Sequence, residues 1–202
     1  MEEKIGALAA AVADRLFVEV EASGRHVHLT EAQALTLFGH GLTEARPLSQ
    51  PGQFVCNERV EIVGPKGSFA RVAVLGPARR EGQVEISLTD AVTLGLKPPV
   101  RLSGSVQGSP GITVRGPKGE LRLEQGVIVA RRHIHMPPDQ AAQRGLKDKQ
   151  VVGLKMFSDR PLVFDDVVVR VDPSFAPRAH IDFDEANACA FRGGDFGMIV
   201  GG

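Results

Sequence analysis

Residues 25–29 read RHVHL, and residues 132–136 repeat the pattern as RHIHM. In each stretch an arginine precedes two histidines that are separated by one β-branched residue. Side chains at positions i and i+2 of a β-strand project from the same face, so each stretch predicts a strand with two imidazoles on one side. A single His-x-His pair is more often a hydrogen-bonded feature of a strand, but histidine is also the most common metal ligand. Two copies with matching flanks favour metal binding.

The two pairs belong to a longer internal repeat. After the first pair comes LTEAQALTLFG, in which Thr30 can cap a helix, and after the second comes MPPDQAAQRGL, with prolines at a helix start. Further along, residues 85–91 (EISLTDA) match residues 180–186 (HIDFDEA). This match aligns Glu85 with His180, Ile86 with Ile181, and Asp90 with Glu185. The chain therefore consists of two related halves.

Each half supplies three potential metal ligands, two from its His-x-His strand and one from the second match. These sets are His26, His28 and Glu85 in the first half, and His133, His135 and His180 in the second. Both His₂Glu and His₃ are ligand sets of catalytic zinc sites, in which a fourth position stays open for water or substrate. The sequence predicts two metal sites of zinc type, with ligands that also suit cobalt, nickel or iron.

The composition is typical of a globular protein that buries a core. Of 202 residues, 43% are hydrophobic and 24% charged, with a formal net charge of +0. This balance gives no bulk attraction to nucleic acid or membranes, and the lack of Trp and Tyr removes stacking platforms for single-stranded nucleic acid. Two isolated cysteines, Cys56 and Cys189, favour a reducing cytoplasm over a disulfide framework. The sequence contains no apolar segment of membrane-spanning length.

Most of the chain has the pattern of short strands separated by turns. The sequence GPKG occurs at residues 64–67 and again at 116–119, between strand-like runs, and 23 Gly and 13 Pro punctuate the chain. Residues 2–16 predict an amphipathic helix, which we expect to pack on the body of the protein. The pattern predicts a mainly β fold of small β-barrels, and residues 97–111 form the most linker-like segment.

The chain resembles the phosphate propanoyltransferase family, the phosphotransacylases of propanediol utilisation and related bacterial microcompartment pathways. The resemblance rests on stretches that follow one another over nearly the whole chain: RHVHL, ERVEIVGPKG, VLGPAR, QVEISLTDA, LGLKPPVRLSG, GVIVARRHIHM and AHIDFDEANA. Members of this family interconvert an acyl-CoA and inorganic phosphate with an acyl phosphate and free CoA. The resemblance therefore implies coenzyme A as substrate or product, with propanoyl-CoA or acetyl-CoA as the acyl donor.

The resemblance also implies an architecture. It implies two β-barrel domains capped by short helices, a pseudo-twofold repeat, two metal ions (normally zinc) at the interface, and a chain that crosses between the barrels. One domain would comprise residues 1–24 and 126–202, including the N-terminal helix and strand, and the other would comprise residues 25–125. A homodimer and a bacterial cytoplasmic location are implied as well. Microcompartment association is possible, although one short helix before the first strand gives no clear encapsulation peptide.

The functional residues of the family carry over to positions in this chain. The first metal ion falls to His26, His28 and Glu85, and the second to His133, His135 and His180, as the internal repeat indicates on its own. The phosphate-binding arginine falls on Arg79, and the neighbouring Arg80 is an alternative. Arginine offers phosphate a bidentate fork that lysine cannot copy. The chain departs from the family at Gly82, where Thr is usual, and at Pro137–Pro138; both departures concern substrate preference more than the reaction.

The implied reaction is attack of phosphate, held by Arg79, on the thioester carbonyl, while a metal ion accepts the departing sulfur. It requires no protein nucleophile, and we expect Cys189 to be a small buried residue. Two other functions use the same ligands. A dinuclear zinc hydrolase would activate water against thioesters or phosphoesters. Metal ions that only join two barrels would need four protein ligands each, whereas each half offers three candidates.

Charged residues near the motifs have structural interpretations too. Asp182, Asp184 and Glu185 either orient the ligating histidines or cap a helix and form ion pairs. Arg25 and Arg132, which precede the histidine pairs, are expected to form structural ion pairs. His40 lies outside both motifs, and we expect it to be a solvated loop residue.

Overall fold

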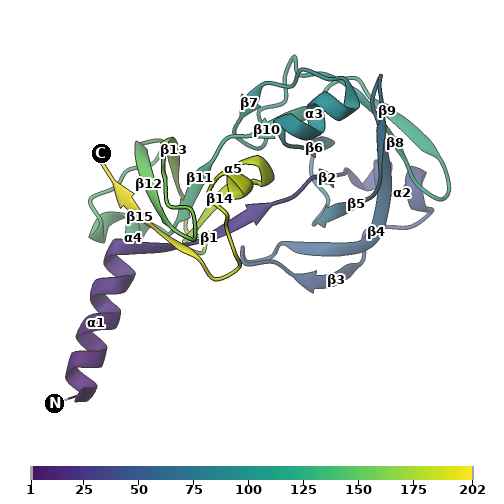
Figure 1. Ribbon diagram of the computed structural model, residues 1–202. Coiled ribbons are helices and arrows are strands. Elements are labelled where there is room, and N and C mark those ends of the chain that lie inside the picture. Colours follow the sequence, from purple (N-terminus) through teal and green to yellow (C-terminus); the bar gives the residue numbers. More distant parts are fainter. Residues whose placement is uncertain (1, 202) are drawn as a thin grey trace. The chain divides into compact units, whose positions relative to one another are not determined.

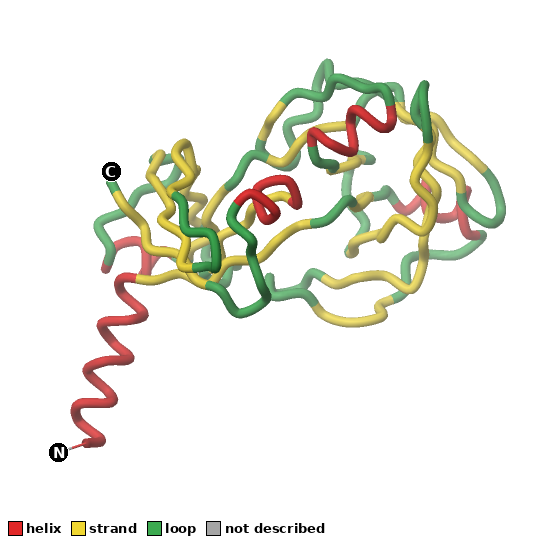
Figure 2. The backbone as a smooth tube through the Cα atoms, in the orientation of Figure 1, coloured by secondary structure: helices red, strands yellow, loops and turns green. Residues whose placement is uncertain are grey.

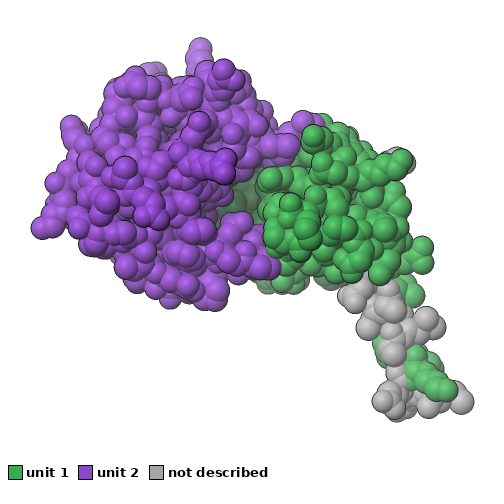
Figure 3. Space-filling model, turned by 180° about the vertical axis from the view of Figure 1, so that it is seen from behind, with its two compact units in different colours: residues 1–23, 132–202 green, residues 24–131 purple. Residues whose placement is uncertain are grey.

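The computed structural model describes residues 2–201, and its chain divides into two compact units. Unit 1 combines the ranges 1–23 and 132–202, and unit 2 comprises residues 24–131 (Figure 3). Strands and loops make up most of both units, and the helices after the first one are short (Figure 2). The prediction of a mainly β fold with two small β domains and short helices is confirmed; unit 1 is a closed barrel, and unit 2 is a nine-stranded sheet that forms a half-barrel.

Unit 1 is a closed barrel of strands. Its elements are α1 (Glu2–Leu16), β1 (Phe17–Ser23), β11 (His133–Met136), α4 (Pro138–Gln143), β12 (Val151–Phe157), β13 (Val163–Val171), β14 (Arg178–Asp182), α5 (Phe183–Ala188) and β15 (Phe196–Val200). The strands follow one another round the barrel in the order β1-β14-β11-β13-β12-β15. The barrel closes where β15, in yellow, runs antiparallel to β1, in purple, so that strands from opposite ends of the chain lie side by side (Figure 1).

Unit 2 is built on one nine-stranded sheet. Its elements are β2 (His26–His28), α2 (Glu31–Phe38), β3 (Glu44–Pro47), β4 (Phe54–Val63), β5 (Ser68–Gly76), β6 (Gln83–Glu85), α3 (Leu88–Leu94), β7 (Val100–Arg101), β8 (Ile112–Arg115), β9 (Glu120–Leu123) and β10 (Val127–Ala130). The hydrogen-bonded order is β7-β10-β6-β2-β5-β4-β8-β9, and β3 pairs with β4. The short strands β2 and β6 therefore lie in the interior of the sheet, with a partner on each side.

The internal repeat appears in the structure as one arrangement of strands that both units share. It runs β10-β6-β2-β5-β4 in unit 2 and β1-β14-β11-β13-β12 in unit 1. In both, the His-x-His strand pairs antiparallel with the strand that carries the third predicted ligand. His26 lies opposite Glu85 in the first pair, and His133 lies opposite His180 in the second. The alignment of Glu85 with His180 in the sequence is therefore a structural equivalence.

The helices that follow the third ligand repeat as well. α3 and α5 each begin with a capping box, which closes on Asp90 in α3 and on Glu185 in α5. The arginine before each histidine pair contacts that same carboxylate: Arg25 reaches Asp90 at 2.7 Å, and Arg132 reaches Glu185 at 2.6 Å. The expected structural ion pairs of both arginines are confirmed. Of the two functions left open for the acidic residues, Asp182 and Glu185 perform helix capping and ion pairing.

The chain passes from one unit to the other before each His-x-His strand. β1 comes directly before β2 in the sequence, yet it pairs with β14 and β15 of unit 1. β10 comes directly before β11, yet it pairs with β6 and β7 of unit 2. We expected residues 126–131 with the C-terminal strands; they lie in unit 2, because Val127 and Ile128 extend the sheet beside Val84 and Glu85.

Strand alternation gives each His-x-His strand a core face and a ligand face. Val27 of β2 packs in the core of unit 2, and Ile134 and Met136 of β11 pack in the core of the barrel. All three are 0% exposed. Because successive side chains of a strand point to opposite faces, these residues anchor the strand while the histidines project the other way. The predicted ligands thus stand on rigid, interior strands rather than on loops.

The predicted N-terminal helix is present as α1, but its expected packing on the body is wrong for the side chains that the structure describes. Ile5, Val12 and Leu16 are 61%, 47% and 46% exposed. The barrel core contains no described side chain of α1, because a closed barrel fills its interior with the inward residues of its own strands. No helix within residues 2–201 combines the length and apolarity needed to cross a bilayer.

Replacing Thr30 by alanine is expected to lower the free energy of unfolding by about 1 kcal/mol. Thr30 is the predicted N-cap of α2, and it closes a capping box in which its Oγ1 accepts from the Gln33 N–H at 3.1 Å while Gln33 Oε1 accepts from the Thr30 N–H at 2.9 Å. Urea denaturation measures the effect. Thr36→Ala on the exposed face of the same helix is the control, because its hydroxyl only bonds back to the Ala32 carbonyl. Equal losses in the two variants would contradict the prediction.

Candidate metal and phosphate sites

The three ligands predicted in the first half of the chain lie together in unit 2. Potential ligand atoms of His26, His28 and Glu85, the unit 2 cluster, all lie within 4.8 Å of one another. His26 Nε2 is 3.5 Å from Glu85 Oε2, and His28 Nε2 is 3.8 Å from Glu85 Oε1. All three side chains are buried. The cluster has the size and ligand types that a transition-metal ion requires.

A backbone carbonyl orients the first imidazole of this cluster. His26 Nδ1 donates to the carbonyl oxygen of Gly24 at 2.9 Å. Because a carbonyl oxygen only accepts, the proton of the neutral ring sits on Nδ1, and Nε2 presents its lone pair toward Glu85. Metal-binding histidines in proteins are commonly held in this way, with the other ring nitrogen bonded to a carbonyl or carboxylate.

The charges within the unit 2 cluster suit metal binding. Burial would raise the pKa of Glu85, but His26 and His28 hold it well below its usual range. Burial lowers the pKa of His28 well below its usual value, and the neighbouring His26 and Arg79 add to this effect. Burial opposes a charge on His26 as well, yet the Glu85 carboxylate outweighs it and raises the pKa of that imidazole. Glu85 is therefore ionised and His28 neutral at pH 7, the forms in which both bind metal.

The three histidines predicted in the second half lie together in unit 1. Potential ligand atoms of His133, His135 and His180, the unit 1 cluster, also lie within 4.8 Å of one another. The ring centroid of His135 is 4.6 Å from that of His133 and 4.9 Å from that of His180. Nδ1 of His135 is buried and has no hydrogen-bond partner among the residues that the structure describes. Three imidazoles this close together offer a metal ion a His₃ ligand set.

Two further residues shape the surroundings of His135. Phe175 stacks on its imidazole with ring centroids 4.0 Å apart, and Arg170 Nη1 lies 3.4 Å from Nε2. Burial lowers the pKa of His135 to about 2, with His133, His180 and Arg170 contributing in the same direction. Neither Phe175 nor Arg170 stands in a recognisable motif, so sequence analysis missed both. Arg170 comes close because β13 places it opposite His135 in register.

Arg79, the predicted phosphate ligand, is linked to the unit 2 cluster. Its backbone N–H bonds the Leu29 carbonyl oxygen at 2.8 Å, which holds the loop after β5 against the end of β2. Its guanidinium donates to Ser103 Oγ at 2.9 Å, and Ser103 in turn donates to Glu85 Oε1 at 2.7 Å. The alternative, Arg80, is exposed. Of the two candidates, Arg79 is therefore the one that hydrogen bonds connect to a predicted metal ligand.

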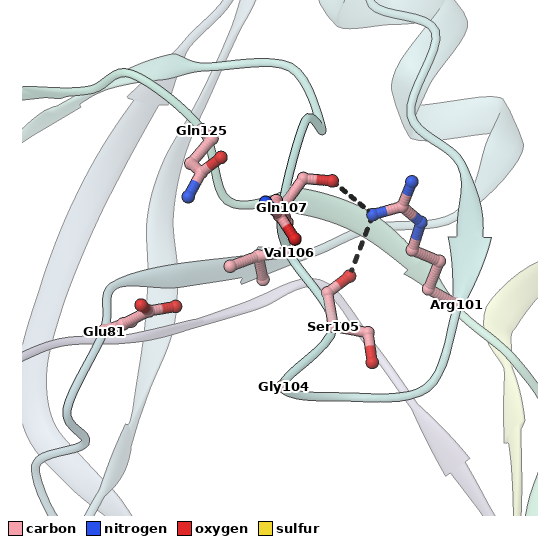
Figure 4. A pocket seen from close by; sticks show the side chains of 7 residues that line it. All are labelled: Glu81, Arg101, Gly104, Ser105, Val106, Gln107 and Gln125. Atoms are coloured by element: carbon pink, nitrogen blue, oxygen red, sulfur yellow. Dashed lines mark hydrogen bonds between the residues drawn. The ribbon is translucent and has the colours of Figure 1, made fainter.

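A cavity of about 570 Å³ lies in unit 2 beside the loop that carries Ser103 (Figure 4). Its lining residues are Glu81, Arg101, Gly104, Ser105, Val106, Gln107 and Gln125. Figure 4 shows the Arg101 guanidinium donating to the backbone carbonyls of Ser105 and Gln107, at 3.4 and 2.5 Å. None of the predicted ligands lines this cavity. What matters here is the loop beside the cavity, which the hydrogen bonds of Arg101 hold in a defined conformation.

Both cysteines are expected to be unreactive in the folded protein. Cys56 and Cys189 are 0% exposed, as predicted for Cys189. Burial raises the pKa of Cys56 to about 11, and it also raises the pKa of Cys189. Because the thiolate is the reactive form, only about one Cys56 in a thousand is ionised at pH 8. Ellman's reagent should titrate no thiol in the native protein and both after unfolding in urea. Rapid reaction of either thiol in the native protein would contradict this prediction.

The fold and the two clusters define a class: a mainly β protein with paired sets of metal-ligating side chains, one of them joined to an arginine that suits an anionic substrate. Over residues 19–192 the chain matches the family model described as phosphate propanoyltransferase. Relatives of that name share 54% identity with it in Listeria monocytogenes, over 91% of this chain and 87% of the relative, and 53% in Clostridioides difficile, over 91% and 89%. The relative in Thermotoga maritima is 53% identical over 90% of this chain and 88% of its own length.

The chain belongs to the phosphate propanoyltransferase family. It is an acyltransferase of the phosphotransacylase type. The resemblance read from its sequence motifs is thereby confirmed.

Proposed function

We propose that the protein interconverts propanoyl-CoA or acetyl-CoA plus phosphate with the acyl phosphate plus CoA, and that it uses two zinc ions and Arg79 to do so. The observation that carries the proposal is the connection of Arg79, through Ser103, to Glu85 of the unit 2 cluster. A group that binds phosphate is thereby held beside a set of metal ligands. Both are needed where an anionic nucleophile meets a polarised carbonyl.

The residues fit two zinc ions. His26, His28 and Glu85 would hold one ion, and His133, His135 and His180 would hold the other. The ionised carboxylate of the first set and the neutral, buried imidazole of His135 in the second support this assignment. When bound, zinc supplies Lewis acidity toward a carbonyl oxygen and a partner for a thiolate sulfur. With three protein ligands per set, one coordination position stays open at each ion.

Arg79 binds the attacking phosphate in this proposal. Its guanidinium offers two parallel N–H donors to two phosphate oxygens, which fixes the orientation of the nucleophile and partly neutralises its charge. A phosphate oxygen forms the bond to the carbonyl carbon, the carbon–sulfur bond breaks, and its electron pair leaves with the CoA thiolate. Burial and the raised thiol pKa of Cys56 and Cys189 favour this direct transfer over an acyl-cysteine intermediate.

A thiol-release assay with propanoyl-CoA and acetyl-CoA, run with and without inorganic phosphate on protein of measured zinc content, tests the proposal. We expect CoA release that requires phosphate, stops after chelation and returns with zinc. The faster substrate identifies the preferred acyl group. Release that ignores phosphate would indicate a thioester hydrolase instead. Folded protein that carries zinc and releases no CoA would indicate metal ions with a structural role only.

The assembly and location of the protein remain separate predictions. On the strength of the family resemblance, we propose a cytoplasmic homodimer that can also associate with a microcompartment. Light scattering of the purified full chain measures the dimer directly. A mass equal to a single 21.6 kDa chain at micromolar concentration would contradict it.

A further inference from the structure

The Ser103 hydroxyl occupies the centre of a hydrogen-bond network in unit 2. Its Oγ lies 2.9 Å from Arg79 Nη1, 2.8 Å from Gln83 Nε2 and 2.7 Å from Glu85 Oε1. A serine hydroxyl has one proton to donate and two lone pairs to accept with. Three neighbours at bonding distance therefore use its whole capacity. No sequence motif marks Ser103, which lies in the segment that has the composition of a linker.

The chemistry of the three neighbours fixes the direction of every bond. The guanidinium of Arg79 and the amide nitrogen of Gln83 only donate, so both lone pairs of Ser103 are taken. Because both of these neighbours donate to Ser103, its own single proton is left for the carboxylate oxygen Oε1 of Glu85, 2.7 Å away. The Ser103 hydroxyl therefore accepts a hydrogen bond from Arg79, donates one to Glu85, and cannot reverse these two directions. It has no lone pair left with which to act as a nucleophile.

The network also distinguishes the two carboxylate oxygens of Glu85. Oε1 accepts from Ser103 and, at 2.5 Å, from Gln83 Nε2. Oε2 lies 3.5 Å from Nε2 of His26, whereas Oε1, which lies 3.8 Å from Nε2 of His28, already accepts these two bonds. The Gln83 amide cannot turn over, because its Oε1 accepts from the Gly104 N–H at 2.8 Å. Two neutral donors thus hold Oε1, while Oε2 is directed toward Nε2 of His26.

The loop that carries Ser103 is itself held in place. The Ser105 N–H bonds the Leu102 carbonyl at 3.0 Å, which closes a turn with Gly104 at its third position. Gly104 has a φ of +93°, the left-handed region that this turn position requires and that glycine adopts without strain. Arg101 then ties the next residues through the carbonyls of Ser105 and Gln107 (Figure 4). Ser103 is therefore presented by a rigid loop.

We propose that Ser103 is a positioning residue, which directs Glu85 Oε2 toward the metal ion of the unit 2 cluster and holds the Arg79 guanidinium for phosphate. The inference rests on the proposed function, since it assumes that the cluster binds metal and that Arg79 binds phosphate. One hydroxyl would thereby set the geometry of both the electrophilic and the nucleophilic side of the reaction. Loss of the hydroxyl affects both together, which a purely structural serine would not do.

The test compares Ser103→Ala, Ser103→Thr and Ser105→Ala in the full chain. Zinc affinity is measured first, by competition with a chromophoric chelator under conditions that resolve two dissociation constants. We expect Ser103→Ala to weaken one of the two constants about 10- to 100-fold and to leave the other unchanged, since loss of a group that orients a ligand typically has this effect. Ser103→Thr keeps the hydroxyl, and we expect it to restore most of the affinity.

Steady-state kinetics provide the second readout. We expect Ser103→Ala to raise the KM for phosphate about tenfold, while the KM for acyl-CoA stays within about twofold of that of the wild type. Ser105→Ala is the matched control from the same loop, because Ser105 is exposed and holds the loop through its backbone atoms. It should leave both zinc constants and both KM values unchanged.

The outcomes separate this inference from the proposed function. Wild-type protein that binds zinc and transfers acyl groups, together with a Ser103→Ala variant equal to it in zinc affinity and phosphate KM, would overturn the inference alone. Wild-type protein that binds no zinc would remove the proposed function and this inference with it. If Ser103→Ala does not fold, a Ser103→Thr variant that still loses affinity for zinc would overturn the role of the hydroxyl.

Discussion

Replacing His28 or His135 by glutamine is expected to remove one zinc ion per chain and to lower phosphate-dependent CoA release on the order of 1000-fold. Each histidine contributes one of only three ligands in its cluster, so its loss leaves too few protein donors to hold the ion. Glutamine keeps a polar side chain of similar size at a buried position, which limits the loss of packing. Elemental analysis of the purified variants gives the zinc content, and the thiol-release assay gives the rate.

His40→Gln is the matched control for both variants. The side chain of His40 is 58% exposed, and its Nδ1 donates to the Gly41 carbonyl, in agreement with the expected solvated loop residue. We expect this variant to keep its zinc and its activity. Full zinc content in His28→Gln or His135→Gln would show that the corresponding cluster is not a metal site. Loss of zinc without loss of activity would show that the ion has no part in the reaction.

Replacing Arg79 by methionine is expected to lower the phosphate-dependent rate about 100-fold, mainly through a higher KM for phosphate. Methionine keeps an unbranched stem like that of arginine but removes the charge and the paired donors. Arg79→Lys restores the charge without the bidentate fork, so we expect it to recover only part of the loss. The rate as a function of phosphate concentration, at saturating acyl-CoA, measures both effects.

Arg80→Met is the control for Arg79, because Arg80 is the exposed neighbour that sequence alone could not set aside. We expect it to keep a phosphate KM close to that of the wild type. If Arg80→Met raised the phosphate KM more than Arg79→Met, Arg80 would be the phosphate-binding residue instead. Equal zinc content in all three variants would show that the arginine acts on phosphate and not on the metal ligands.

The ligand clusters could be predicted because their signals are local. The alternation in RHVHL and RHIHM sets two imidazoles on one face of a strand, whatever the rest of the fold does. The match of EISLTDA with HIDFDEA then supplied Glu85 and His180, since equivalent strands in a repeat pair in equivalent register. Two independent local patterns thus agreed on six residues, and the structure brings each set of three together.

The features that could not be predicted depend on long-range pairing. Ser103 contacts Glu85 across 18 residues that include α3 and β7, and a lone serine in a Gly- and Pro-rich segment carries no periodic signal. The strand Val127–Ala130 is apolar along its length and would fit either unit equally well by composition. Its pairing with β6 depends on the rest of the sheet and cannot be read from the sequence of the strand itself. The amphipathic pattern of residues 2–16 likewise predicts an apolar stripe on a helix, but it does not identify a surface that the stripe would pack against.

The passage of the chain between the units has a consequence for how the protein is made. All strands of unit 2 come from one continuous stretch, so this unit can complete its sheet as soon as residue 131 has left the ribosome. Unit 1 cannot do so, because its first strand needs partners near the other end of the chain; the ion pair between Glu19 and Arg178 spans 159 residues.

During that interval β1 has been synthesised but has no neighbour on either side. A strand of this kind offers its open hydrogen-bonding groups to any other nascent chain, which is how intermolecular pairing and aggregation begin. The barrel therefore forms late, by closing a long loop. Until then, the unpaired strand β1 is the part of the nascent protein most prone to pair with another chain. Slow translation after residue 131 lengthens the wait, and a chain that stops before β14 leaves β1 unpaired for good.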